Sequence, residues 1–355
     1  MTDATSAVPV PARSERGWGK LLFALAAFLI LPTVPQLRAL LPVERTIVLL
    51  VPALAACCLV GWWAGGKLLT AVVWVGFAVL LAVQKSASPD TFQNLARGWS
   101  LLLAGAFGLV CLFGVRRPLF ARALVALGVA LTLATMMSAL GPVTPAHVQR
   151  AVGSELARRN GETMGLINGF IEQHPGEWND LIKKVPSMGT VPAETEKQLA
   201  TLSQAGAGLY PALLALESIM ALALAWAMYH RLSRARLGNP LQPLREFRFN
   251  DQLVWGLITG LTIVFLPTLQ SFRGLGRNLL LFFGALYAIR GLGVLAWFLA
   301  PGALVMGLTV GFAMLWLPVL QFFSALGFLM LGIAAFGLGL GDTWADWRRR
   351  ARSTS

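Results

Sequence analysis

Long apolar runs alternate with short polar segments along almost the whole chain, most clearly in its last hundred residues. Between Asp251 and Asp342 only three charged side chains occur, at Arg273, Arg277 and Arg290. Such a stretch cannot remain stable while exposing its apolar surface to water. A helix needs about 20 apolar residues to cross a bilayer. The pattern therefore predicts an all-α protein, a polytopic transmembrane helix bundle.

Eight apolar runs have lengths near that of one membrane span. A ninth, Gly302–Leu340, is too long for a single span. Leu317-Pro318 lies near its middle, and proline kinks or ends a helix because it lacks a backbone N–H donor. We expect a hairpin here and ten spans in all, whereas one kinked helix would give nine. The other eight runs are Trp18–Val34, Thr46–Trp63, Leu68–Val83, Trp99–Phe113, Pro118–Leu140, Gly208–Met228, Gln252–Leu269 and Asn278–Leu299.

Basic residues between the runs predict the orientation. An inside N-terminus puts Lys67, the cluster at 116–122 and the loop at 230–248 on the cytoplasmic side, as the positive-inside rule requires. Ten crossings return the C-terminus to the same side. We therefore expect a disordered cytoplasmic tail over residues 1–17 and a basic cytoplasmic tail over 342–355. The bias is imperfect, because six basic residues fall on the outer side: Arg38, Arg45, Lys85, Arg97, Arg273 and Arg277.

The one long polar segment, residues 141–205, predicts a small extracytoplasmic helical insert. Its apolar positions recur at helical spacing, as in Val148, Val152 and Leu156. Breaks are expected at Asn160-Gly161, at Pro175-Gly176 and between Pro186 and Pro192. This insert separates an N-terminal transmembrane half of five spans, residues 18–140, from a C-terminal half, residues 206–341.

Composition supports a membrane protein and excludes several other classes. Hydrophobic residues make up 56% of the chain and charged residues 13%, far from the balance of soluble domains. The net charge of +13 lies in loops between apolar runs, so it indicates topology rather than nucleic-acid binding. Three cysteines and three histidines have no metal-ligand spacing, and no nucleotide loop or catalytic constellation occurs. We expect no metal, no cofactor and no enzymatic activity.

Two charges lie inside predicted spans, Glu217 in the sixth and Arg290 in the eighth. A charge at the centre of a bilayer costs at least about 2.5 kcal/mol, so each needs a partner or water. Either the two pair and hold the bundle together, or they line a polar cavity. In the second case Tyr287, Gln270, Gln321 and Asn278 contribute, and the substrate-binding candidates are Glu217, Arg290, Tyr287, Gln321 and Gln270.

The chain closes on Asp342, Trp344, Asp346, Trp347 and Arg348. Asp342 and Asp346 are four residues apart on one helical face, which could contact a partner or a metal. The alternative is an interfacial anchor in which Asp342 caps a turn and the tryptophans lie among lipid headgroups. Two glycine pairs, Gly256 with Gly260 and Gly291 with Gly293, indicate close helix packing.

Three segments together resemble a known family. They are Leu-Arg-Glu-Phe-Arg-Phe at 244–249, the stretch from Asn278 through Tyr287 to Leu292, and the closing Gly-Leu-Gly-Asp-x-Trp-x-Asp-x-Arg of Gly337 to Arg348. Over residues ~206–350 the chain resembles the YybS-like DUF2232 family of bacterial membrane proteins. That family is similar to the substrate-binding S components of energy-coupling-factor transporters. The resemblance implies a multi-pass protein of the bacterial cytoplasmic (inner) membrane.

Two functions fit these observations. The first is a small-molecule-binding or transport-associated subunit, similar to an S component, that works with a separate ATPase or transmembrane coupling subunit. The Ala-x-x-x-Ala face typical of the first helix of S components is absent from Trp18–Val34 but present at Ala126 and Ala130. The second is a membrane scaffold of the cell envelope that docks partners through the insert or the basic loop. The lipid bilayer is a partner in both.

Overall fold

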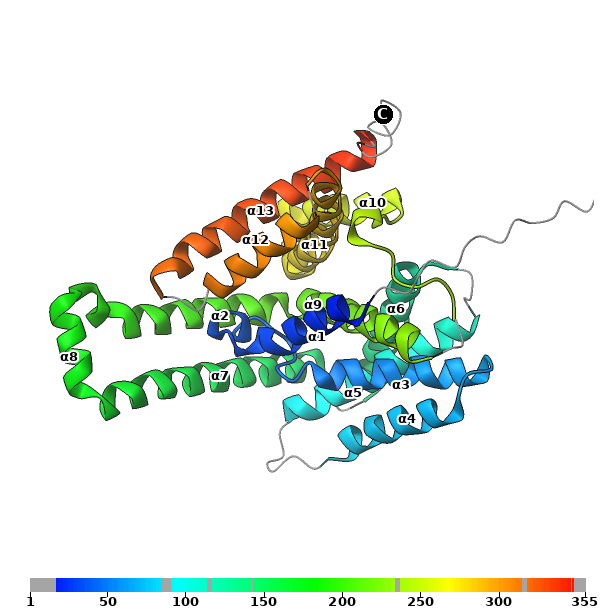
Figure 1. Cartoon of the computed structure of the whole chain (residues 1–355), viewed down its shortest axis with the longest axis horizontal. Helices are drawn as coiled ribbons and strands as arrows, with labels where there is room; N and C mark the ends of the chain where they lie inside the picture. The colour runs from blue at the N-terminus through cyan, green and yellow to red at the C-terminus, as the bar shows by residue number, and fades with distance from the viewer. Residues whose placement is uncertain are drawn as a thin grey trace, which may run out of the picture.

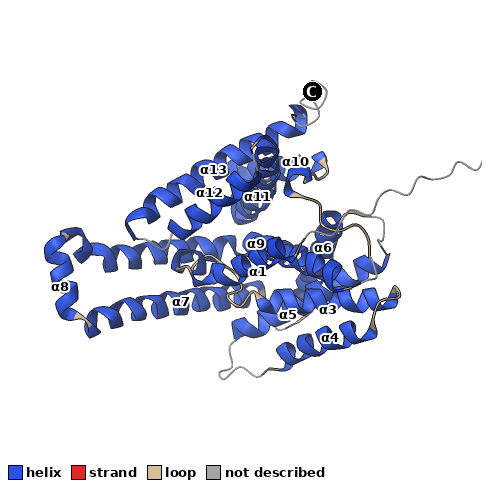
Figure 2. Ribbon diagram, viewed as in Figure 1, coloured by secondary structure: helices blue, strands red, loops and turns tan. Residues whose placement is uncertain are grey.

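The computed structural model describes residues 17–84, 91–113, 117–141, 143–233, 237–299, 301–314, 318–345 and 347. Every regular element in this part of the chain is a helix (Figure 2), which confirms the all-α prediction. Five helices there are long and apolar enough to cross a membrane, and five further apolar helices are shorter. One of them contains the α-helix α10 (Val254–Phe265), whose 12 residues span about 18 Å of a hydrocarbon core of about 30 Å. The expected nine to ten crossings therefore stay a prediction.

The N-terminal half consists of helices that follow the apolar runs. The first run is broken near its prolines: after Ile30 a short 3-10 helix contains Pro32, and a separate short helix begins at Pro35. The turn between α3 and α4 contains Gly65 at φ 92°, a backbone conformation that residues with a side chain rarely adopt. The elements are α1 (Trp18–Ile30), η1 (Leu31–Thr33), α2 (Pro35–Arg38), α3 (Ile47–Trp63), α4 (Leu68–Val83), α5 (Thr91–Phe113) and α6 (Leu119–Leu140).

The polar insert forms a long helical arm. In Figure 1, α7 (Pro145–Gln173) and the first half of α9 (Val191–Leu232) run side by side away from the bundle, and α8 (Pro175–Lys184) lies at the tip. A short 3-10 helix, η2 (Pro186–Thr190), leads from α8 into α9. The breaks expected near Pro175 and Pro186 are confirmed, whereas α7 continues through Asn160-Gly161. The expected boundary between 205 and 206 falls inside α9, which continues from the arm into the membrane half.

Helix α9 also passes through Pro211, which removes one backbone donor. Asn278 of α11 binds the groups around this site: its Oδ1 accepts from Ala212 N at 2.9 Å, and its Nδ2 donates to Gly208 O at 2.9 Å. A side-chain amide therefore bridges two backbone groups that an uninterrupted helix would pair with each other. This contact lets one helix connect the arm to the core, and it gives Asn278 a structural role.

The C-terminal half contains η3 (Leu244–Glu246), η4 (Asp251–Leu253), α10 (Val254–Phe265), η5 (Pro267–Phe272), α11 (Arg273–Phe298), α12 (Pro301–Met314) and α13 (Pro318–Ala345). The long apolar tract thus forms two helices, with residues 315–317 between them outside the described part. The hydroxyl of Ser324 in α13 donates to Gly311 O in α12 at 2.6 Å. The two helices lie side by side (Figure 1), as the predicted hairpin requires.

Helix α9 occupies the middle of the bundle and contacts α3, α6, α7 and α11. Trp226 and Leu222 of α9 pack with Phe107 of α5 in the largest apolar cluster. Helices α11 and α13 approach so closely that a Cβ at Gly291 would lie 1.7 Å from Ala335 O. The predicted packing role of Gly256 and Gly260 is confirmed, because added Cβ atoms there would collide with Phe283 and press on Leu280 of α11.

Candidate functional site

Arg290 of α11 joins three elements of the C-terminal half. Its Nε donates to Oδ2 of Asp342 in α13 at 3.0 Å, and its Nη1 donates to Oδ1 of Asp251 in η4 at 2.5 Å. Its Nη2 donates to the backbone oxygen of Asp342 at 3.2 Å. Arg290 and Asp342 are buried, whereas the Asp251 side chain is 59% exposed. We call these three residues the Arg290 centre.

Local sequence positions each member of this centre. The side chain of Asn250 caps η4 by accepting from Gln252 N at 3.0 Å, which places Asp251 at the start of the helical segment. The close crossing at Gly291 brings α13 against α11 one residue after Arg290. Phe249 lies under the guanidinium, 5.4 Å from ring centroid to Cζ, and Tyr287 contacts that ring edge-on at 5.0 Å. With its charge paired, its guanidinium stacked on Phe249 and its side chain buried, Arg290 is well placed to hold α11, α13 and η4 together.

Asp342 does not cap a turn after Gly341, so this part of the anchor interpretation is wrong. Helix α13 continues to Ala345, and Asp342 is buried inside it because Arg290 balances its charge. Trp344 and Trp347 are exposed, at 68% and 42%, so their headgroup role stays a prediction. Asp346 and Arg348 lie outside the described residues.

Glu217 does not pair with Arg290, which corrects the structural hypothesis for these two charges. Its Oε2 accepts a hydrogen bond from Val43 N at 3.0 Å, so it faces the segment before α3. Arg290 faces α13 and η4 instead. The error has a physical cause: a sequence fixes the depth of a residue on its helix but does not say which neighbours that helix faces.

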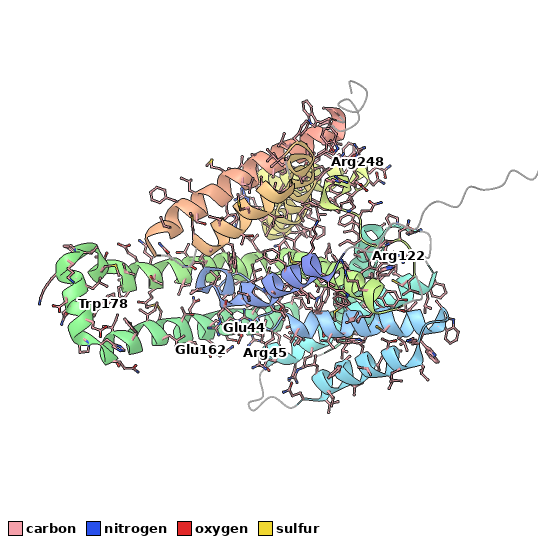
Figure 3. All side chains as sticks on the ribbon, viewed as in Figure 1. Glu44, Arg45, Arg122, Glu162, Trp178 and Arg248 are labelled. Carbon is pink, nitrogen blue, oxygen red and sulfur yellow. The ribbon has the colours of Figure 1, made fainter. Side chains whose placement is uncertain are left out.

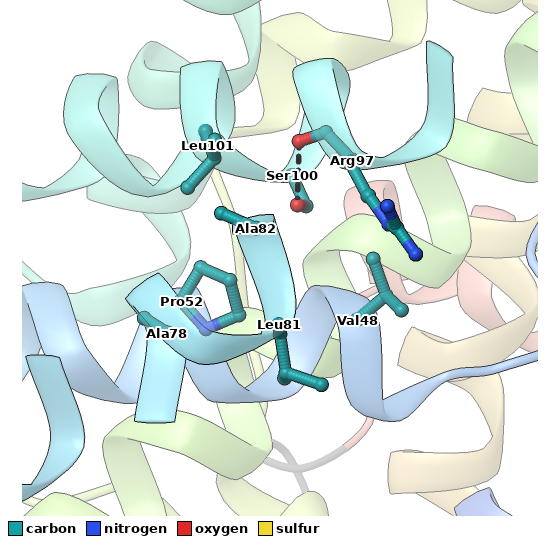
Figure 4. A pocket seen from close by; sticks show the side chains of 8 residues that line it. All are labelled: Val48, Pro52, Ala78, Leu81, Ala82, Arg97, Ser100 and Leu101. Atoms are coloured by element: carbon teal, nitrogen blue, oxygen red, sulfur yellow. Dashed lines mark hydrogen bonds between the residues drawn. The ribbon is translucent and has the colours of Figure 1, made fainter. Parts of the chain in front are cut away.

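The structure does not bring the five substrate-binding candidates together. Tyr287 is fully buried beside Arg290, Gln270 is exposed in η5, and the side chain of Gln321 lies outside the description. A cavity of about 10 Å³, room for about one water, lies elsewhere between α3, α4 and α5 (Figure 4). Its lining contains none of the candidates: Val48, Pro52, Ala78, Leu81, Ala82, Arg97, Ser100 and Leu101.

A second charged cluster, which the sequence did not reveal, lies where the arm meets the bundle. Three arginines and three glutamates form it, and we call it the arm-base cluster: Arg38, Glu44, Glu155, Arg158, Arg159 and Glu162. Figure 3 shows Glu44 and Glu162 beside each other between α2 and α7. Arg159, almost fully buried, lies at its centre.

Arg159 is held by both side chains and backbone. Its Nε donates to Glu155 Oε1 at 2.8 Å, and its Nη1 donates to Leu41 O at 2.7 Å. Its Cζ lies 5.4 Å from the ring centroid of Phe92 in α5. Arg38 binds Glu44 at 2.7 Å and Glu162 at 2.6 Å, which ties α2 to α7. The cluster therefore fastens the arm to the segment between α2 and α3.

Charge pairing sets the protonation of this cluster. Burial alone would raise the pKa of Glu155, but hydrogen bonds from Arg158 and Arg159 outweigh it and lower that pKa. A hydrogen bond that Arg38 donates lowers the pKa of Glu162, and the hydrogen bonds that Arg158 donates to Glu155 raise the pKa of Arg158. Glu155, Glu162 and Arg158 are thus held in their charged forms by one another and by Arg38 and Arg159.

Helix spacing could have revealed part of this cluster. Glu155 and Arg159, and likewise Arg158 and Glu162, are four residues apart and face each other on a helix. Arg38 and Glu44 could not be assigned, because more than a hundred residues separate them from α7. In the described part of the chain, no group of three or more His, Cys, Asp or Glu side chains is placed to hold a metal ion.

Long apolar helices with buried, paired charges define an integral membrane protein of the helical class. The family model described as "Predicted membrane protein (DUF2232)" matches residues 91–334, more than half of the chain, and the chain belongs to this family. The search of curated proteins found no match. The search of solved structures found none either.

The matched range qualifies the resemblance seen in the sequence. It begins at residue 91, far before the expected start near 206, and so includes the arm and both charges of the sixth and eighth spans. It includes the 244–249 segment and the Asn278–Leu292 stretch. It ends at 334, before the closing segment that carries Asp342. Arg290 and Asp251 of the Arg290 centre thus lie within the match, and Asp342 lies beyond it.

Proposed function

We propose that this membrane protein is a scaffold that binds a protein partner through the outer part of its arm. We call residues 164–198 the distal arm. One observation carries the proposal: in this range no described side chain is buried. The distal arm nevertheless carries large apolar side chains, and Leu166 and Phe170 of α7 are exposed at 75% and 53%.

Exposed apolar positions at the tip support the same function. Leu181 of α8 is exposed, and so is Val185, the residue directly after this helix. Trp178 marks the tip of the arm, far from the bundle (Figure 3). A soluble helical hairpin normally buries its apolar stripe against another element. Apolar patches that a chain leaves uncovered, with polar residues around them, are typical of interaction sites.

Basic residues suggest on which side the arm lies. The α3–α4 turn and the end of α9 lie at the side of the bundle opposite to α8 (Figure 1). Lys67 belongs to that turn and Arg231 to that helix end. Arg38 and Arg158, near the arm, are balanced by glutamates. By the positive-inside rule, this distribution supports an arm on the outside and an opposite end in the cytoplasm, in keeping with the proposed location in a bacterial inner membrane.

The transport hypothesis has less support. A substrate-binding subunit needs polar side chains that converge on a cavity. Glu217 instead binds a backbone amide and Arg290 is occupied by two aspartates. The two side chains therefore face different parts of the bundle and do not converge on one cavity. A role beside a separate ATPase and the likeness to S components remain alternatives that the experiment below can separate.

The test compares two variants of the full-length protein in native membranes. In the first, Leu166, Phe170, Leu181 and Val185 are replaced by Asn. The matched control replaces the arm residues Glu172 and Lys197 by Ser. After mild crosslinking, the wild type and the control should migrate as a complex on a native gel, and the apolar variant should not. All three should melt at the same temperature after purification, since the replaced side chains are exposed.

Two outcomes would overturn the proposal. One is an unchanged complex with the fourfold variant. The other is wild-type protein that migrates as the isolated chain in native membranes. Recovery of an ATPase that persists in the fourfold variant would favour the transport alternative.

A further inference from the structure

Glu217 is a carboxyl group inside the apolar half of α9. It is 5% exposed and shares a helix face with Leu214 and Ala221. Its Oε2 accepts from Val43 N at 3.0 Å, whereas Oε1 is buried and has no hydrogen-bond partner among the described residues. A single backbone N–H donor stabilises a buried anion only weakly.

Apolar side chains from three other helices lie beside this face of α9. Leu214 and Ala221 pack in one cluster with Phe28 of α1, Leu49 of α3 and Ala96 of α5.

Two titratable groups do act on Glu217. Arg159 from α7 is the positive one, and Tyr210 lies on α9 itself. Arg159 is already bound to Glu155 and to Leu41 O. A negative charge on Glu217 would therefore have Val43 N as its hydrogen-bond donor but share its one cation, Arg159, with Glu155.

We propose that Glu217 is a proton-binding site whose proton keeps residues 39–46 docked on α9. An ionised carboxylate in an apolar site with a single donor is costly, and such a group takes up a proton instead. The neutral acid still accepts from Val43 N through its carbonyl oxygen. This site goes beyond the proposed scaffold function and does not depend on it.

The docked segment explains why the proton matters. Residues 39–46 are held at one end by Arg159, which donates to Leu41 O, and at the other by Thr46, whose hydroxyl donates to Phe28 O at 3.3 Å. Glu217 holds the middle through Val43. Loss of the proton keeps the contact with Val43 N but creates a charge that attracts Arg159 away from Leu41 O. Proton release in the membrane half would thereby loosen the segment on which the arm base rests.

The first measurement is the infrared spectrum of full-length protein in lipid nanodiscs at neutral pH. Replacing Glu217 by Gln keeps an oxygen for Val43 N and preserves the fold. The difference between wild type and Glu217→Gln should show the loss of a protonated carboxylic-acid band. The matched control, Glu155→Gln, should show the loss of carboxylate bands. Loss of carboxylate bands in Glu217→Gln would overturn the proposal.

The second measurement is hydrogen exchange of the 39–46 segment at neutral and alkaline pH, corrected for the intrinsic rate. A neutral acid in the folded state binds a proton that the unfolded chain releases, so stability falls as pH rises. In wild type the segment should exchange at least tenfold faster at alkaline pH, and in Glu217→Gln it should not. Equal pH dependence in both proteins would show that the Glu217 proton does not hold the segment.

Discussion

The two halves of the arm differ sharply although they belong to the same two helices. Near the bundle, Val152 and Leu156 of α7 pack with Phe92 in an apolar cluster, and Leu199 of α9 is buried. Asn160 adds a hydrogen bond to Ser203 across the pair at 2.8 Å. From residue 164 to 198, no described side chain is buried. We call the part near the bundle the proximal arm.

This difference shows that the arm is attached to the bundle at its base, but that its outer part has no buried core of its own. The arm-base cluster fixes the proximal arm through balanced charges and backbone contacts. The distal arm keeps its helices without the burial that normally stabilises a helical pair, since isolated helices are marginal in water. Its exposed apolar side chains are therefore available to contact another surface. Substitutions in the two parts of the arm should therefore differ in effect, and the largest effect is expected outside the arm, in the C-terminal half.

Replacing Asp342 by Asn should destabilise the C-terminal half most. Arg290 would lose its buried carboxylate partner and keep the exposed Asp251 and the backbone oxygen of residue 342, and breaking a buried pair costs roughly 3–5 kcal/mol. Thermal melting in detergent should report this loss, while exchange in the proximal arm stays unchanged. Asp251→Asn is the control with a smaller effect. A proximal arm that loosens together with the Arg290 centre would show that the two regions are not independent.

Two leucines on α7 form a matched pair for the arm itself. Leu156 is 4% exposed and Leu166 is 75% exposed. Leu156→Ala should cost about 2–5 kcal/mol because it leaves a cavity. Leu166→Ala should change stability by less than about 0.5 kcal/mol in the purified protein. Equal losses in chemical unfolding would mean that the distal arm has a core after all.

Arg159→Met should weaken the attachment of the arm by about 1.5–3 kcal/mol, because the buried guanidinium donates to a carboxylate and to backbone oxygens. Arg158 still pairs with Glu155 in this variant, which limits the loss. Arg150→Met on the same helix is the control, since Arg150 binds only its own helix in the described contacts. Proteolysis of the proximal arm should rise in the first variant alone.

The smallest effect concerns acid. The pKa values of Glu155 and Glu162 are lowered from 4.5 by arginine partners, so their stabilising effect is present above that value and is lost as pH falls below it. Glu155→Gln with Glu162→Gln should flatten the decline of the melting temperature in acid. Each carboxylate should contribute less than about 1 kcal/mol, because the cluster is partly exposed. An unchanged acid profile would remove these two groups from the account.

Helix type, the break near Pro318 and the arm were readable from apolar periodicity and proline positions. The partners of buried charges were not. Arg290 binds Asp251 and Asp342, which lie 39 and 52 positions away. Glu217 binds Val43, 174 positions away. Hydropathy indicates how deep a residue lies but not which neighbours its helix faces. The prediction that each buried charge needs a partner was therefore correct, whereas the prediction that Glu217 and Arg290 pair with each other was wrong.

The central claim is that the distal arm is covered by a partner in the membrane and uncovered in the isolated protein. Hydrogen exchange of residues 164–198 tests it directly when native membranes are compared with purified protein. We predict slow exchange in membranes and fast exchange after purification, while the proximal arm stays slow in both. Distal-arm exchange that is equally fast, or equally slow, in the two preparations would contradict the claim.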